Sequence, residues 1–87
     1  VEIETKSINN VLVRSIGNGA LIACLTDTIS TADAEPLALG IVAWLEELGT
    51  AGATIAVFRD SAFEDDVAKS NLAAILEQHG IKQVRSL

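Results

Sequence analysis

Residues 54–84 read TIAVFRDSAFEDDVAKSNLAAILEQHGIKQV, and this stretch decides the fold because it predicts a complete strand-helix-strand unit. Residues 54–58 form a short apolar run, typical of a buried strand. A helix is predicted over about 67–79, and Gly80 should end it, with Ile81 packing back after the glycine. The residues QVRSL at 83–87 predict a last short strand. Because a right-handed crossover joins them, the two strands should lie parallel in one sheet.

The residues that precede this unit predict an antiparallel meander. VEIET at 1–5 and VLVRSI at 11–16 alternate between apolar and polar residues, and the turn signals Asn9-Asn10 and GNG at 17–19 bound them. The third strand, predicted over 20–25, is apolar on both faces. It is therefore expected to be a central strand, covered above and below.

Another helix is predicted between the meander and the strand at 54–58. Asp33 is the expected N-cap, with Glu35 and Pro36 in the first turn, and Gly49 should end the helix after residue 48. Leu39 and Val42 are expected on the side away from the core, which makes that side more apolar than a solvated helix requires. The core-facing stripe consists of Leu37, Ile41, Trp44, Leu45 and Leu48.

These elements predict an α/β domain: a mixed sheet of four to five strands, in which the N-terminal antiparallel meander is followed by β-α-β-α-β, with two helices. If the strands follow chain order, both helices cover the same face. The other face would then show water a row of Leu, Ile, Val and Ala side chains, and such a patch exceeds what a soluble monomer tolerates. We therefore expect a partner to cover it.

Composition narrows the function classes. The chain has 87 residues, which predicts one domain over 1–87, and a formal net charge of -6, so direct contact with nucleic acid is not expected. No apolar run approaches the roughly 20 residues that cross a bilayer, so no membrane contact and a cytoplasmic location are expected. The single cysteine, Cys24, is expected to be a buried, inert thiol. The absence of Met suggests a piece of a longer polypeptide.

The loop FRDSAFEDD at 58–66 has two interpretations. In one, Asp60 and Ser61 meet Asp27 at the end of the parallel strands and form an acid/base or Mg²⁺ site. The only histidine, His79, lies at the far end of the second helix, and no nucleophile-base pair favours a free-standing enzyme.

In the other interpretation the loop is structural. Asp65 or Asp66 caps the second helix, and Lys69 pairs with these carboxylates along the helix surface. Asn71, if buried, would tie down the turn at Asp60. This interpretation accounts for more of the residues.

Residues 57–87 resemble the extreme C-terminus of the modification subunits of type III restriction-modification systems, which are DNA adenine methyltransferases. In that family a strand ending in Phe-Arg-Asp-Ser leads to a Phe, an acidic pair, Lys-x-Asn, a helix, a Gly and a short final strand. GALIACLTDTIS at 19–30 is also similar to the family's strand before its first C-terminal helix. Ser70 departs from the family pattern, where Thr is expected. The matching residues are Phe58, Arg59, Asp60, Ser61, Phe63, Asp65, Asp66, Lys69, Asn71 and Gly80.

The resemblance implies a parent enzyme that methylates adenine N6 in DNA with S-adenosylmethionine. Such enzymes carry an Asp-Pro-Pro-Tyr site that stacks on the flipped base, whereas this chain has one Pro and no Tyr. No catalytic, cofactor-binding or metal-binding residue is therefore expected in this C-terminal domain.

The family's C-terminal regions are associated with self-association and with assembly of the restriction complex. The implied partner is a second copy in a homodimer, the rest of the methyltransferase, or the restriction subunit. The alternative is a small α/β ligand- or Mg-binding module that uses the strand-end carboxylates.

Overall fold

The computed structural model describes residues 3–16, 19–24, 28–49 and 55–86, with the backbone alone described at 3, 19–24 and 86. The α/β class and the two helices that the sequence predicts are confirmed. Neither helix is long and apolar enough to cross a membrane within the described ranges. The elements are β1 (Ile3–Ile8), β2 (Val11–Ile16), β3 (Gly19–Cys24), α1 (Thr31–Leu48), β4 (Ile55–Phe58), the 3₁₀ turn η2 (Asp60–Ala62), α2 (Asp66–Gln78) and β5 (Gln83–Ser86).

The strands pair in chain order, β1-β2-β3-β4-β5. The first three are antiparallel, whereas β3, β4 and β5 are parallel neighbours. The β1–β2 connection is the two-residue turn predicted at Asn9 and Asn10, whose φ angles of 51° and 67° place both residues in the left-handed region. That conformation matches the twist of a two-residue hairpin, and asparagine tolerates it better than most side chains.

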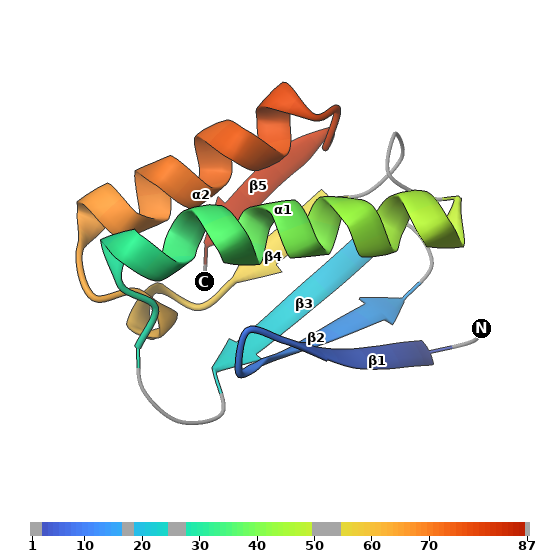
Figure 1. Ribbon diagram of the computed structural model, residues 1–87, viewed down its shortest axis with the longest axis horizontal. Coiled ribbons are helices and arrows are strands. Elements are labelled where there is room, and N and C mark those ends of the chain that lie inside the picture. Colours follow the sequence, from blue (N-terminus) through green and yellow to red (C-terminus); the bar gives the residue numbers. More distant parts are fainter. Residues whose placement is uncertain (1–2, 17–18, 25–27, 50–54, 87) are drawn as a thin grey trace.

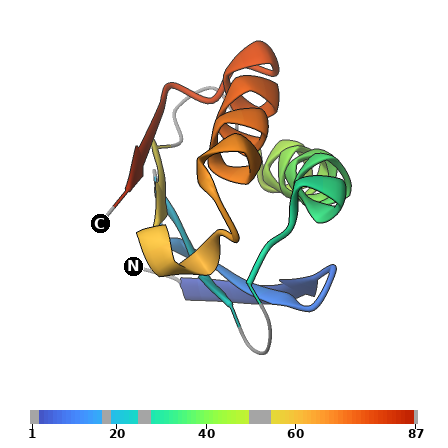
Figure 2. The ribbon, with the colours of Figure 1, turned by 90° about the vertical axis from the view of Figure 1, so that its left-hand side faces the viewer.

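Both helices lie on the same face of the sheet, side by side (Figures 1 and 2). Chain order explains this arrangement, because two successive right-handed crossovers that advance in one direction leave their helices on one side. The helices and the inner sheet face enclose the core. The largest fully buried side chains are Phe58, Leu37, Ile41, Leu45, Leu72, Leu76 and Val13.

The start of α1 differs from the prediction. Its N-cap is Ser30, with extended φ and ψ of -85° and 167°, and not Asp33. The Ser30 hydroxyl accepts from the Asp33 backbone N–H at 3.2 Å and donates to the Asp33 carboxylate at 3.0 Å. Ser30 and Asp33 thus form a reciprocal cap, which satisfies a free N–H of the first turn and moves the helix start toward the N-terminus. Pro36 consequently lies inside the helix.

The rest of α1 mostly follows its predicted pattern. Trp44 is 6% exposed and belongs to the core, and Gly49 ends the helix with a φ of 75°. Leu39 is 44% exposed, as its place away from the core predicts, but Val42 is only 6% exposed and the prediction for it is wrong. Because α2 packs against α1, the buried sector of α1 is wider than contact with the sheet alone would require.

Both ends of α2 follow their predicted chemistry. The Asp65 carboxylate accepts from the Ala68 N–H at 2.9 Å and caps the first turn. At the other end Gly80 has a φ of 90°, and the Ile81 N–H donates to the Leu76 carbonyl at 3.0 Å. This is a Schellman ending, and Ile81, 3% exposed, packs back onto the core as predicted.

Candidate functional site

The strand-end loop holds Asp60 and Ser61 in the 3₁₀ turn η2, directly after β4. The Asp60 carboxylate accepts from Lys69 Nζ at 2.8 Å. The prediction that Lys69 pairs with Asp65 or Asp66 is wrong, because the amine reaches back to Asp60 in the turn. Both partners are substantially exposed, so the pair orients the loop and adds only about 0–1 kcal/mol of stability.

The loops after β3 and β4 are joined by their backbones. Ile29 and Phe63 form a parallel bridge, in which the Ile29 N–H donates to the Ala62 carbonyl at 2.7 Å and the Glu64 N–H to the Ile29 carbonyl at 2.8 Å. Both bridge side chains are buried. In open α/β sheets ligands usually bind outside the carboxyl ends of the strands where the strand order reverses, and the described strands β3, β4 and β5 run in chain order without a reversal. The bridge instead joins the two loops at these strand ends, which favours the structural interpretation of the loop.

The remaining predictions for a ligand site find little support at this loop. Asp27 lies outside the described residues, so its approach to Asp60 stays a prediction, and so does the burial of the Cys24 side chain. Asn71 is exposed and therefore does not meet the condition of a buried amide. Within the described ranges no three His, Cys, Asp or Glu side chains gather into a metal-binding group.

Six of the ten residues that carry the resemblance have structural roles in this loop and in α2. The rings of Phe58 and Phe63 contact each other, with centroids 5.6 Å apart and an interplanar angle of 59°. Asp60 pairs with Lys69, Asp65 caps α2, and Gly80 ends it. The pattern therefore encodes a strand end, a tied turn and a capped helix.

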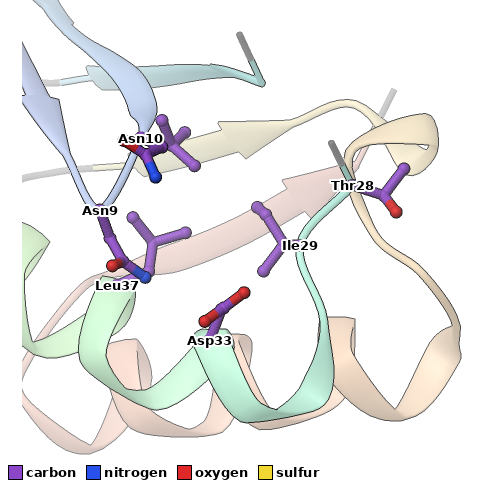
Figure 3. Close-up of a pocket in the computed structure, with 7 residues that line it drawn as sticks. Asn9, Asn10, Thr28, Ile29, Asp33 and Leu37 are labelled. Atoms are coloured by element: carbon purple, nitrogen blue, oxygen red, sulfur yellow. The ribbon is translucent and has the colours of Figure 1, made fainter. Parts of the chain in front are cut away.

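A small polar hollow of about 110 Å³ lies between the β1–β2 turn and the first turn of α1. In Figure 3 the Asp33 carboxylate points toward Ile29, and the Asn9 amide is drawn beside Leu37. The sequence predicts Asn9 and Asn10 in a turn and Asp33 in a cap, but it does not show that the packing of α1 on the sheet brings the turn and Asp33 to one hollow. The hollow has room for only a few waters, and Asp33 already accepts from Ser30.

The second candidate site is the sheet face that no described element covers (Figure 2). Val11, Val13 and Ser15 point to the helices and are buried, so the alternate residues of β2 point outward. Likewise Ala56 and Phe58 point inward from β4. We call the outward-pointing set the open face; its described side chains are Thr5, Ser7, Leu12, Arg14, Ile16, Ile55, Val57, Gln83 and Arg85.

The open face is less uniformly apolar than predicted. Ile16 is 46% exposed, and Leu12, Ile55 and Val57 are partly exposed, which gives four aliphatic side chains. Arg14 and Arg85 interrupt them. The strand registers place both arginines in one row with Val57, on β2 and β5. Three strand spacings separate them, about 14 Å at about 4.8 Å per spacing.

Charge is divided between the two sides of the domain. The chain has twelve acidic and six basic residues, yet none of the described open-face residues is acidic. By contrast, α1 carries Asp33, Glu35, Glu46 and Glu47 and no Lys or Arg. Arg85 Nη2 donates a 3.0 Å hydrogen bond to Oε1 of Gln83, its neighbour on the open face. The open face therefore combines aliphatic surface with positive charge on an otherwise acidic protein.

No family model, no curated protein and no solved structure matches this chain.

Proposed function

We propose that this chain is a non-catalytic assembly domain and that the open face is its contact surface. The observation that carries the proposal is the group Leu12, Ile16, Ile55 and Val57, which lies where no described element covers the sheet. Burying a fully exposed aliphatic side chain is worth about 1.5–3 kcal/mol, so Ile16, at 46% exposure, would gain about half of that and the three less exposed side chains would each gain less. Covering this group would therefore favour association.

We further propose that the domain forms the C-terminus of a type III restriction-modification DNA adenine methyltransferase. The support is the resemblance of residues 57–87, whose matching positions make one continuous strand-turn-helix structure. In this proposal the rest of the parent binds S-adenosylmethionine and methylates adenine N6, in the cytoplasm. The open face packs against a second copy, the rest of the methyltransferase or the restriction subunit.

The contact surface is tested by a pair of matched substitutions, Ile16→Lys and Val67→Lys. Both residues have large, exposed aliphatic side chains, at 46% and 57%, but Ile16 lies on the open face and Val67 lies in the first turn of α2, on the helix side of the sheet. Sedimentation of the parent complex should show loss of assembly with Ile16→Lys and no change with Val67→Lys. Equal behaviour of the two variants would refute the assignment of the open face.

The parent is tested separately by reading the coding sequence next to this domain. An Asp-Pro-Pro-Tyr site and a glycine-bearing S-adenosylmethionine motif are expected in the same polypeptide. A parent that lacks both motifs would refute the proposal of a methyltransferase. The proposal that the open face is a contact surface would not be affected.

A further inference from the structure

The outer side of α1 carries an apolar stripe with acidic borders. The exposed residues Ala32, Pro36, Leu39 and Ala43 follow one another at spacings of three or four and therefore share one side of the helix. Leu39, at its centre, is 44% exposed. We call these four residues the outer stripe. Glu35 and Glu46 border it on one side and Glu47 on the other, all three exposed.

The outer stripe and the open face have complementary charges. On the open face Val57 lies between Arg14 and Arg85 in one row, and on the outer stripe Leu39 lies between Glu35 and Glu46 along the helix axis. Complementary charges at the rim of a contact steer two surfaces together and exclude wrong pairings. In a symmetric contact, the open face of one copy would pack on the open face of another. Two aligned sheets centred on one another would then bring like-charged arginines together.

The spacings of the two charge pairs also agree. Glu35 and Glu46 are eleven residues apart, about 16 Å along a helix axis at about 1.5 Å per residue. Arg14 and Arg85 are about 14 Å apart across the strands, from about 4.8 Å per strand spacing. A helix laid across the strands along this row would thus place one carboxylate near each arginine, with Leu39 near Val57.

We propose that the open face of one copy binds the outer stripe of α1 of a second copy, head to tail. This inference rests on the proposed function and names the partner of its contact surface. α1 lies on the side of the sheet opposite the open face (Figure 2), so the contact joins two different surfaces, is heterologous, and adds copies in a ring or a row. The outer stripe runs over 32–43, about 16 Å along the helix axis, so the contact is small and association is expected to be weak.

The test uses charge reversal at exposed residues, which should not disturb folding; circular dichroism and thermal unfolding confirm this. The face variant is Arg14→Glu with Arg85→Glu, and the stripe variant is Glu35→Lys with Glu46→Lys. A fourfold variant carries all four changes. The control variant is Glu64→Lys with Glu77→Lys, two exposed carboxylates outside the outer stripe.

Net charge separates specific from general effects. Each Arg→Glu lowers the charge by two and each Glu→Lys raises it by two, so the face variant has -6 - 4 = -10 and the stripe and control variants have -6 + 4 = -2. The fourfold variant returns to -6. A smaller net charge reduces general repulsion, so weaker association of the stripe variant cannot come from net charge.

Sedimentation velocity up to about 1 mM protein in about 50 mM salt, where screening is weak, measures the outcome. The unmodified chain and the control variant should form species larger than dimers as concentration rises. The face and stripe variants should associate about tenfold more weakly, and the fourfold variant should regain association because its reversed surfaces again attract.

Three results would overturn the inference: a strictly monomeric unmodified chain, a stripe variant that associates as well as the control, or a fourfold variant that stays monomeric. If the stripe variant associates normally while Ile16→Lys abolishes assembly, the head-to-tail partner is wrong and the open face remains the contact surface. If neither the stripe nor Ile16 matters, the proposed function is wrong as well.

Discussion

The close contact between Gly40 and Ile8 gives a sharp test of how α1 lies on the sheet. A Cβ added at Gly40 would lie 2.6 Å from Ile8 Cγ2, whereas ordinary contacts begin at 3.4 Å. The missing 0.8 Å (3.4 - 2.6) must come from movement of the helix or of the half-buried Ile8 side chain. Overpacking of this kind costs about 1–3 kcal/mol.

Helix propensity acts in the opposite direction, because alanine is favoured over glycine inside a helix by about 0.8–1.0 kcal/mol. Gly40→Ala in the unmodified chain should therefore be neutral or destabilising by up to about 2 kcal/mol. In an Ile8→Ala background the clashing methyl group is gone, so the same change should stabilise by up to about 1 kcal/mol. The sign of the effect is thus expected to reverse.

Urea unfolding of the four proteins of this double-mutant cycle, followed by circular dichroism, measures the coupling. A coupling energy of about 1–3 kcal/mol is expected between the two positions. Independent effects at Gly40 and Ile8, with a coupling near zero, would mean that α1 does not lie on β1. The helices would then not cover the face of the sheet assigned to them, and the identification of the opposite face as the open face would also be wrong.

Two further predictions concern the strand-end loop. Asp65→Ala should lower the free energy of unfolding by about 1 kcal/mol, because it leaves the Ala68 N–H without its cap. The control Asp66→Ala should change the free energy of unfolding by less than half as much. Comparable losses for the two variants in urea titrations would contradict the assignment of Asp65 as the cap. The unmodified protein is expected to give no heat of binding when it is titrated with Mg²⁺ in a calorimeter. Asp60→Asn should therefore leave the titration unchanged. A heat of binding that is present in the unmodified protein and lost in this variant would favour the Mg-binding alternative.

Local chemistry made the ends of most elements predictable. The left-handed residues Asn9, Asn10, Gly49 and Gly80 stand where the sequence places a turn or a helix end, because few other residues adopt positive φ at low cost. The N-terminus of α1 was harder. Ser30 and Asp33 are both good caps, and only their mutual hydrogen bonds show that they act together.

Contacts between distant parts of the chain were not predictable from periodicity. Val42 is buried because α2 packs against α1, and helical spacing alone does not include that neighbour. Lys69 had nearer carboxylates in sequence, but it pairs with Asp60, nine residues away. The alignment of Arg14 with Arg85 needs the register of four strands, which no single segment contains.

The Ile29–Phe63 bridge makes the two βα connections mechanically interdependent. Each loop supplies both a donor and an acceptor to the other, so neither can swing outward without breaking the pair of bonds at 2.7 and 2.8 Å. The amino ends of α1 and α2 are consequently anchored to one another at their common rim. A displacement of the start of either helix by a bound neighbour would therefore be transmitted to the start of the other helix through these two hydrogen bonds.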